Sequence, residues 1–464
     1  MSGAPADDSW RSLLGPSHLG TSTLLAGGVA LYATNEFLTV SLLPSAIAEI
    51  GGARLYAWVT TLYLLGSVAA AATVNVTLLR VGARWSFLLG LLVFGLGSIV
   101  CTAAPGMAVL LLGRTLQGAA GGLLAGLGYA LITTTLPRAL WTRASALVSA
   151  MWGVATVIGP AAGGLFAQFG LWRGAFGVMA ALSVVMGVLV PAVLPAGHAE
   201  PGQPVQAPHV PKWSVLVLSA AALTVSIAQV PTNVALTVTL LALSTALIVA
   251  FVIVDRRATA KVLPPSMFGP GPLKWIYLAL AVLMMSAMVD MYVPLFGQRL
   301  AHLVPVVAGF LGAELAIGWA VSEIVSASLK SERAIRRVVV AAPLTITLGL
   351  TLAAVTQVEN APASLVVTWA AALTLTGVGL GAGWPHLSAW AMHCVDENEG
   401  AAAGAAINTV EMIAGAFGAG LAGVVVNSAQ GGVVVAARAL FAVFAAVGIL
   451  GMLAARRAVR GLSS

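Results

Sequence analysis

The chain has 464 residues, of which 59% are hydrophobic and only 8% are charged, and its mean hydropathy is +1.00. Soluble domains carry about 25% charged residues, so this composition excludes an ordinary soluble protein and indicates a membrane protein. The net charge of +7 does not require a nucleic-acid partner, because membrane proteins concentrate Lys and Arg on cytoplasmic loops. Cys101 and Cys394 lack metal-binding spacing, and we expect neither a metal site nor a cofactor.

Apolar segments repeat along the whole chain. About 20 residues span the hydrocarbon core of a bilayer, and fourteen segments approach or exceed that length. They lie at residues 22–46, 56–79, 86–104, 107–134, 144–168, 174–194, 213–230, 233–254, 274–298, 304–328, 336–357, 363–390, 402–427 and 431–455. We therefore expect an all-α membrane protein with 14 transmembrane helices.

The basic residues are sorted unequally between the two ends of these segments. With the N-terminus inside, only Arg54, Arg173 and Arg299 of the 22 Lys and Arg residues fall outside, while Arg114 and Arg438 lie within segments. Lys and Arg favour the cytoplasmic side. The sequence thus predicts a multi-pass protein of the cell membrane with both termini in the cytoplasm.

Two polar breaks divide the chain into parts. Residues 195–212 are rich in proline and therefore extended, and residues 255–273 form a second break. Between them lies an apolar hairpin with no ionisable residue in its two spans, which we interpret as a lipid-facing insert. The predicted parts are a tail at 1–21, a six-helix bundle at 22–194, a linker at 195–212, a two-helix insert at 213–254, a linker at 255–273, a second six-helix bundle at 274–455 and a tail at 456–464.

A weak internal repeat links the two predicted bundles. Arg80 and Arg84 follow the second span, and Arg333 and Arg337 follow the tenth span at the same spacing. Repeated halves are typical of secondary transporters.

Arg114 lies inside an apolar run, MAVLLLGRTLQGAAGGLLAGLGYALI, at residues 107–132. A guanidinium there costs at least about 3 kcal/mol and cannot lose its proton, so it must face protein groups, water or a ligand. The segment LLLGRTLQGAAGG at 110–122 resembles the fourth-helix motif of the major facilitator superfamily, through Arg114, Gln117 and Gly118.

A second motif lies in the next span. GVATVIGPAAGG at residues 153–164 resembles the antiporter motif of the family's fifth helix, through Gly159, Pro160, Gly163 and Gly164. Proline bends a helix and glycines permit tight packing. In the family this helix is held to seal the transport path against leakage.

Further segments extend the resemblance over most of the chain. TNEFLTVSLLPSAIAEIG at 34–51 is similar to first helices of family drug exporters, and Trp172, Arg173 and Phe176 resemble the outer start of the sixth helix. ATAKVLPPSMF at 258–268 resembles the stretch after the extra hairpin of the fourteen-helix drug–proton antiporters.

The resemblance implies the major facilitator fold, with two six-helix bundles plus a two-helix insert. It implies proton-coupled export of small apolar or cationic compounds by alternating access, and a transporter rather than an enzyme. The expected partners are a hydrophobic small molecule, protons and membrane lipids, with no nucleic acid, and we expect a monomer.

The loop after the second span departs from the family pattern. The family places an Asp before the first Arg, where NVTLLRVGARW has Leu79, although Arg80, Gly82 and Arg84 are retained. In the family that Asp helps to latch the cytoplasmic side. We therefore expect a cytoplasmic gate at Arg80, Gly82 and Arg84 that has a weaker latch, has different partners or serves a divergent substrate.

Coupling to protons needs a titratable group inside a span, and a desolvated carboxylate suits this role because burial raises its pKa. Glu36 is the leading candidate, since its counterpart in the resembled exporters is a proton and substrate site. Glu314, Glu411 and Asp290 are further candidates. Glu314 and Glu411 could instead form pairs that fix helix packing, and Asp290 could belong to an outer gate or extend its carboxylate to the membrane surface. Glu36 could hydrogen-bond Asn35 or a neighbouring helix.

We expect Arg114 to be coupled to Glu36, because both are deep charges on helices that resemble cavity-lining ones. Three other functions are compatible with the sequence: export of a lipid or lipid-linked molecule, a non-transporting membrane scaffold or sensor, and uniport of a nutrient.

Overall fold

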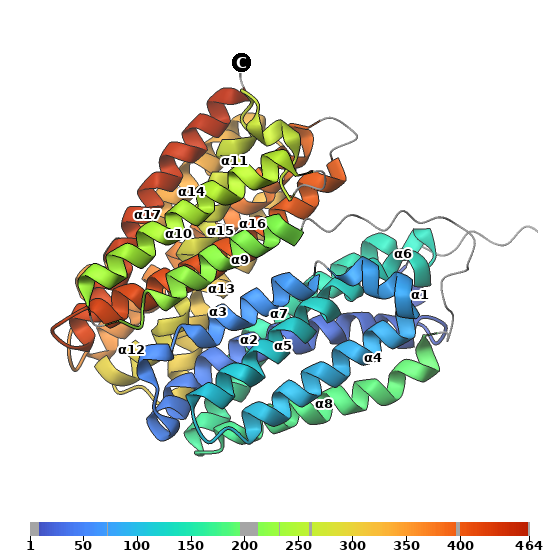
Figure 1. Cartoon of the computed structure of the whole chain (residues 1–464), viewed down its shortest axis with the longest axis horizontal. Helices are drawn as coiled ribbons and strands as arrows, with labels where there is room; N and C mark the ends of the chain where they lie inside the picture. The colour runs from blue at the N-terminus through green and yellow to red at the C-terminus, as the bar shows by residue number, and fades with distance from the viewer. Residues whose placement is uncertain are drawn as a thin grey trace, which may run out of the picture. The chain divides into compact units, whose positions relative to one another are not determined.

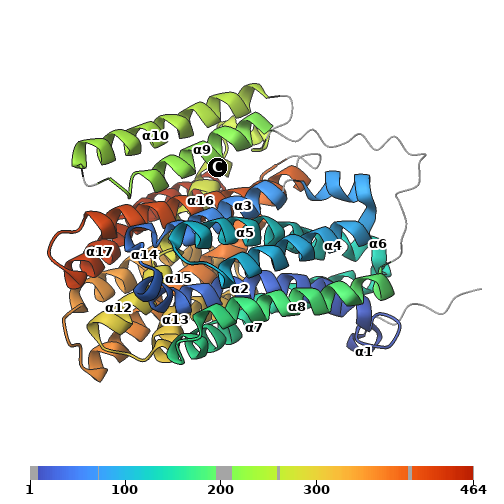
Figure 2. The same cartoon turned by 60° about the horizontal axis from the view of Figure 1, so that its bottom comes forward.

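The computed structural model describes residues 9–71, 73–194, 212–231, 233–258, 262–395 and 400–462, a part of the chain that is helical and contains no strand. The chain divides into two compact units (Figures 1 and 2). The first comprises Met1–Gly51 and Leu65–Val210, and the second comprises Gly52–Leu64 and Pro211–Ser464.

Some predicted parts fall outside the described residues. These are residues 1–8 of the N-terminal tail, residues 195–211 of the first linker, residues 259–261 of the second linker and residues 463–464 of the C-terminal tail. The predicted domain boundaries therefore stay predictions.

The first unit is built from long helices joined by short turns. Its elements are α1 (Trp10–Leu13), α2 (Leu19–Ile50), α4 (Val74–Thr102), α5 (Met107–Ala130), α6 (Ile132–Thr135), η2 (Arg138–Leu140), α7 (Trp141–Gln168) and α8 (Trp172–Val193). Helix α3 (Trp58–Ala71) is divided between the units after Leu64.

The second unit is also built mainly from long helices joined by short connections. Its elements are η1 (Ala53–Leu55), α9 (Lys212–Ile227), α10 (Val234–Arg257), η3 (Pro265–Phe268), α11 (Leu273–Ala287), η4 (Asp290–Tyr292), α12 (Val293–Leu300), α13 (Pro305–Ala327), α14 (Glu332–Thr356), α15 (Ala363–His393), α16 (Gly400–Ser428) and α17 (Val433–Gly461).

Most helices coincide with the predicted spans, but the predicted span 56–79 contains the end of α3 at Ala71 and the start of α4 at Val74. Eleven spans of the described part are long and apolar enough to cross a membrane. The other three predicted spans contain α3 and α9, which are shorter, and α2, whose hydropathy is lowered by the polar stretch Thr34-Asn35-Glu36. The all-α membrane architecture expected from the sequence is confirmed.

Two spans differ in detail from the prediction. The expected loop between 79 and 86 is a sharp turn at Gly82 inside α4, where φ is 78° and ψ is 171°. This left-handed φ favours glycine. The expected span 274–298 is broken after α11 by η4, which the apolar pattern did not signal.

In the first unit α2 packs tightly on α7. A Cβ atom on Gly159 would lie 2.5 Å from Cβ of Phe37 and 3.0 Å from the backbone nitrogen of Leu38, and one on Gly163 would collide with the Leu38 carbonyl. Van der Waals contact between small residues stabilises helix pairs in membranes, where lipid provides no hydrophobic drive. These glycines therefore set the spacing of α2 and α7.

In the second unit the closest contact joins α13 and α15. A Cβ atom on Gly318 would lie 2.5 Å from the Thr374 carbonyl, and one on Gly377 would collide with the Leu315 carbonyl. Helices α9 and α10 lie side by side as a hairpin (Figures 1 and 2), and α10 is largely exposed. The buried carboxylate of Asp255 accepts hydrogen bonds from backbone nitrogens after α10, of Val262 at 2.8 Å and Leu263 at 3.0 Å.

Candidate functional site

Arg114 lies on α5 with 1% of its surface exposed. Its Nη1 donates a 2.9 Å hydrogen bond to Oε1 of Gln117, one turn along the same helix. Gln117 is held in turn from α4, because its Nε2 donates to Oγ of Ser98 at 2.9 Å. A buried charge is strongly destabilising without such partners. The polar chain from α5 to α4 therefore keeps the guanidinium in place within the first unit.

Glu36 lies on α2, is partly buried and interacts electrostatically with Arg114. Its neighbour Asn35 is fully buried, and neither polar atom of its amide has a hydrogen-bond partner in the described part of the chain. The alternative of a structural hydrogen bond between Glu36 and Asn35 is therefore not realised. An unsatisfied buried amide costs about 1–3 kcal/mol, so α2 carries an unsatisfied polar group directly beside the acid.

The motif on α7 lies against this part of α2. Gly159 and Gly163 contact the two residues that follow Glu36. The helix continues through Pro160, and Gly164 is buried. The motif glycines thus remove side-chain bulk next to the acid, and a larger side chain there would push α2 and α7 apart.

An aromatic pair lies near this part of α2, and one of its members shares a helix face with Glu36. Tyr32 is buried one turn earlier on α2, and its hydroxyl accepts a 3.2 Å hydrogen bond from Oγ of Ser67 on α3. The ring packs edge-to-face on Trp152 of α7, with centroids 5.6 Å apart. Gly121 of α5 leaves room for the Tyr32 ring. Sequence reasoning missed Tyr32, although its four-residue spacing from Glu36 was a usable signal.

The acids of α13 in the second unit have neutral donors as partners. Oγ1 of Thr374 on α15 lies 3.0 Å from Oε2 of Glu314 and 2.9 Å from the Ala370 carbonyl, so its single hydrogen is shared between these two acceptors. Oε2 of Glu323 accepts from Nε1 of Trp319 at 2.9 Å, one turn earlier on α13. Both acids are partly buried. Their hydrogen bonds resemble structural links within or between helices.

Asp290 and Glu411 lie on other elements of the second unit, and both are partly buried. Asp290 begins η4, the turn that separates α11 from α12, and Glu411 lies on α16. Next to Asp290, the hydroxyl of Tyr56 donates a 3.0 Å hydrogen bond to the Met291 carbonyl. Tyr56 also stacks on Tyr292, with ring centroids 4.6 Å apart. Broken helices often line binding sites in transporters.

Comparison with known proteins decides the family. The sequence matches the model of the Major Facilitator Superfamily over residues 25–419. The chain belongs to the major facilitator superfamily. It is 63% identical to a probable multidrug-efflux transporter of Mycobacterium tuberculosis strain CDC 1551 / Oshkosh and, equally, to one of strain ATCC 25618 / H37Rv. Each alignment covers 97% of this chain and 96% of the relative.

Solved structures of major facilitator proteins share the fold at low identity. The nucleoside transporter NupG is 13% identical with a TM-score of 0.63, and covers 94% of this chain and 98% of its own. A bacterial homologue of the human lysosomal transporter Spinster is 13% identical with a TM-score of 0.64, and covers 96% and 97%. The predicted family and fold are confirmed, and the chain is a multi-pass membrane transporter rather than an enzyme.

The predicted cytoplasmic gate of this major facilitator protein lies at the turn in α4. Arg80 is exposed just before Gly82, and Arg84 is partly buried just after it. The Nε atom of Arg84 is buried without a hydrogen-bond partner in the described part of the chain. Leu79, at the position of the family's Asp, is partly buried and offers no carboxylate to these arginines.

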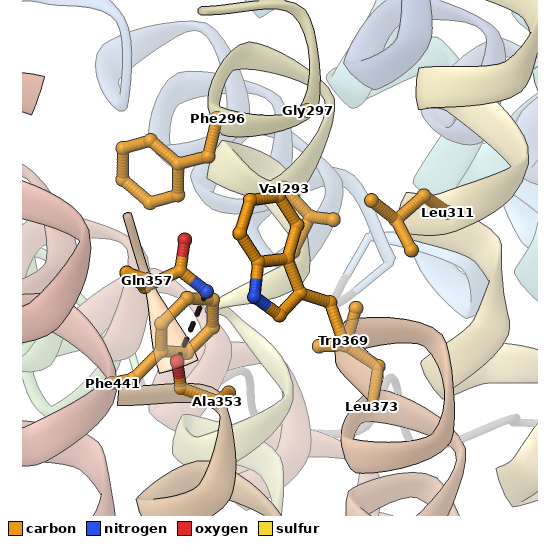
Figure 3. Close-up of a pocket in the computed structure, with 9 residues that line it drawn as sticks. All are labelled: Val293, Phe296, Gly297, Leu311, Ala353, Gln357, Trp369, Leu373 and Phe441. Carbon is orange, nitrogen blue, oxygen red and sulfur yellow. Dashed lines mark hydrogen bonds between the residues drawn. The ribbon is translucent and has the colours of Figure 1, made fainter. Parts of the chain in front are cut away.

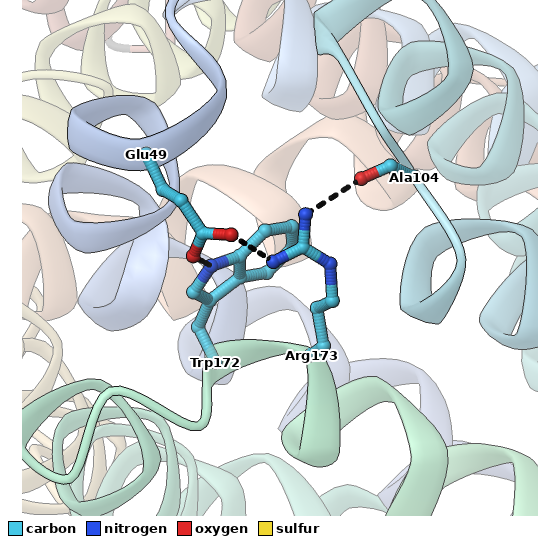
Figure 4. A network of polar contacts seen from close by, with 4 residues as sticks. All are labelled: Glu49, Ala104, Trp172 and Arg173. Atoms are coloured by element: carbon cyan, nitrogen blue, oxygen red, sulfur yellow. Dashed lines mark hydrogen bonds and ion pairs between the residues drawn. The ribbon is translucent and has the colours of Figure 1, made fainter.

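The sequence patterns did not single out Glu49, which lies in the last turn of α2. Its Oε2 accepts a 2.7 Å hydrogen bond from Nε1 of Trp172, and its Oε1 forms an ion pair with Arg173 (Figure 4). Nη2 of Arg173 also donates to the Ala104 carbonyl at 3.0 Å. The hydrogen bonds from Trp172 and Arg173 lower the pKa of Glu49. Arg173 could have indicated this ion pair, because few basic residues are expected on the predicted outer side of the membrane.

A small pocket lies inside the second unit of this transporter, among α12 to α15 and α17 (Figure 3). Its volume is about 10 Å³, enough for roughly one water molecule. Trp369 and Phe441 line it together with Gln357, whose Oε1 has no hydrogen-bond partner among the described residues. Binding sites for drug-sized molecules need at least about 300 Å³, so this pocket is not the transport site.

Proposed function

We propose that this major facilitator transporter exports small apolar or cationic molecules in exchange for protons, by alternating access. Two relatives that are 63% identical bear the name of probable multidrug-efflux transporters. Those names support efflux and small-molecule substrates. Proton exchange would provide the driving force. A proton gradient can drive a substrate against the substrate's concentration gradient only if the transporter has a group that binds protons.

The interaction of Glu36 with Arg114 is the observation that carries this proposal. The carboxyl group can bind and release a proton, whereas the guanidinium keeps its charge. A fixed positive charge favours the ionised carboxylate. A shift between α2 and α5 during transport would therefore change the proton affinity of Glu36. In this scheme Glu36 carries the proton and Arg114 regulates it.

The surroundings of Glu36 fit the proposed substrates. Tyr32 lies one turn before Glu36 on α2 and packs on Trp152, and aromatic faces attract cations. The unsatisfied amide of Asn35 would gain a partner from a polar group of the substrate or from water. Gly159 and Pro160 would shape the helix that seals this path.

The remaining expectations belong to the same proposal. Both termini would lie in the cytoplasm, Arg80, Gly82 and Arg84 would act at the cytoplasmic gate, and the transporter would work as a monomer in contact with lipid. Glu314, Glu411 and Asp290 would have secondary roles in coupling. Reporter fusions at the two termini would test the orientation, and light scattering of the purified protein would test the monomer.

The test is transport of a lipophilic cationic dye such as ethidium in proteoliposomes with an imposed pH gradient. We expect gradient-driven flux in the wild type, and loss of that flux in Glu36→Gln and Arg114→Ala. Glu359→Gln removes an exposed carboxylate and serves as the control, with unchanged flux. Full gradient-driven flux in either test variant would overturn the assigned pair.

Other outcomes would identify the alternative functions. Dye flux that ignores the pH gradient would replace proton exchange by uniport. Movement of a labelled lipid without movement of the dye would favour lipid export. Absence of flux for every tested compound, in folded protein, would favour a scaffold or sensor.

A further inference from the structure

A basic groove runs between α14 and α17 of the second unit. Its volume is about 440 Å³, far larger than the pocket among α12 to α15 and α17. The residues that line it include Arg336, Arg337, Val340, Leu344, Met452 and Arg456. The two helices pack directly on one another, so both walls of the groove belong to one packed helix pair. The transport site proposed above involves none of these residues.

The groove changes from basic to apolar along its length. On α14, Arg337 and Leu344 are two helical turns apart, about 10 Å along the axis. On α17, Met452 lies one turn from Arg456 toward the middle of the helix. The three arginines therefore gather at the end of the groove that the charge distribution predicts to be cytoplasmic. The aliphatic side chains line the part that enters the membrane.

The three arginines at the basic end of the groove have different partners. Nη2 of Arg336 pairs with Oε1 of Glu332 at 2.6 Å, one turn earlier on α14. Arg337 and Arg456 are exposed, and neither has an ion pair with a carboxylate among the described residues. Two guanidinium groups facing one groove repel each other and favour an anion between them.

A tryptophan contact indicates how deep the basic end of the groove lies in the membrane. The guanidinium of Arg457, next to Arg456, stacks on the ring of Trp275 at the start of α11, 4.4 Å from the ring centroid. Trp residues concentrate where the membrane meets water. The basic mouth of the groove therefore lies at the level of lipid headgroups, with its apolar part at the level of the acyl chains.

We propose that this groove binds one anionic phospholipid of the predicted cytoplasmic leaflet. Arg337 and Arg456 would hold the phosphate and the negative headgroup, because guanidinium groups bind phosphate oxygens with two parallel hydrogen bonds. Val340, Leu344 and Met452 would contact the first part of an acyl chain. Basic sites between transmembrane helices on the cytoplasmic side suit such lipids, and a soluble anion would leave the aliphatic walls uncovered.

The experiment uses the full-length protein purified in detergent and measures bound lipid by native mass spectrometry, with the melting temperature recorded in parallel. The probes are dioleoylphosphatidylglycerol, dioleoylphosphatidylcholine with the same chains, and inorganic phosphate. We expect the anionic lipid to bind in one tight copy and to raise the melting temperature, and the other two probes to do neither. In the double variant Arg337→Gln/Arg456→Gln we expect this affinity to fall by about twentyfold.

The control is Arg333→Gln/Arg460→Gln. It removes the same charge from exposed positions about one turn away on the same two helices, outside the groove. We expect it to keep the tight copy. Equal loss in both double variants would mean general attraction to basic surface and would overturn the site.

Leu344→Asn tests the apolar part, and we expect it to weaken the lipid severalfold. If Leu344→Asn binds the anionic lipid as the wild type does, or if inorganic phosphate raises the melting temperature as much as the lipid, the groove is an anion site and the lipid assignment is wrong. Each of these measurements is independent of transport, so failure of the proposed proton exchange would leave the lipid result unaffected.

Discussion

Each unit has an acid beside a tightly packed pair of helices, but the two acids have different polar neighbours. In the first unit Glu36 adjoins the glycine contacts of α2 and α7, where it interacts with Arg114 and has an unsatisfied amide as its neighbour. In the second unit Glu314 adjoins the glycine contacts of α13 and α15, where it accepts a hydrogen bond from Thr374.

The difference shows that depth in a membrane does not by itself make an acid functional. A hydroxyl donor can satisfy a carboxyl group and link two helices, whereas a fixed charge and an unsatisfied amide leave a polar site that gains from a change in protonation or from a ligand. We therefore rank Glu36 above Glu314 as the proton carrier, and transport and stability measurements can test that ranking.

The largest expected effect separates the two acids directly. Glu36→Gln should lower gradient-driven dye efflux at least about a hundredfold, because transfer of a proton through a positioned group is lost. Glu314→Gln should keep efflux within about threefold, since an amide oxygen can still accept from Thr374. The measurement is initial efflux rate against imposed pH gradient. Equal losses in the two variants would remove the distinction between the units.

The hydrogen bonds of the two units should differ in stability. Gln117→Leu removes one hydrogen-bond acceptor of Arg114 and should cost about 1.5–3 kcal/mol, the range for a hydrogen bond to a charged group. Thr374→Val removes the donor to Glu314 and should cost about 1 kcal/mol, since that acid is partly exposed to begin with. Thermal unfolding in detergent measures both. A larger loss in Thr374→Val would reverse the proposed order.

Two glycine substitutions on α7, only one of which meets α2, should change the stability of the protein in opposite directions. Gly163→Ala forces a methyl group against the Leu38 carbonyl and should destabilise by about 1–3 kcal/mol. Gly153→Ala, on the same helix, meets no atom within 4 Å and should stabilise by about 0.5–1 kcal/mol through helix propensity. Melting temperatures of the two variants should therefore move in opposite directions. A loss in both would show that α7 responds to bulk in general.

The smallest effect concerns the exposed link of Glu49 to α8. The pKa of Glu49 is lowered in the folded protein, so its contribution is present above the unfolded pKa of about 4.3 and is lost as pH falls through the folded value. Glu49→Gln should lower the melting temperature slightly at pH 7, and the difference from the wild type should shrink at acid pH. A difference that is constant with pH would show that the charge contributes nothing.

Local patterns carried much of the prediction. The motif around Arg114, the glycines around Pro160 and the fourteen apolar segments are each readable from neighbouring residues, because helix formation and membrane burial depend on stretches of about 20 residues. The family, the helical membrane fold and the transporter class are confirmed. The roles of Glu36, Arg114 and the other site residues stay predictions.

Long-range contacts were beyond the sequence. Glu49 meets Trp172 and Arg173 more than 120 residues later in the chain. The turn at Gly82 and the break at η4 were likewise hidden, because short irregularities inside an apolar run leave its composition unchanged.

The sequence by itself determined that this chain is a helical membrane transporter of the major facilitator superfamily, since apolar length, charge sorting and local motifs are properties of contiguous residues. Only the tertiary structure decided which polar groups meet. It gave Arg114 the amide of Gln117, brought Thr374 to Glu314, and gathered Arg337 and Arg456 at one groove. The physical reason is that a hydrogen bond or ion pair requires atoms within a few ångströms of each other, and packing between distant helices sets those distances.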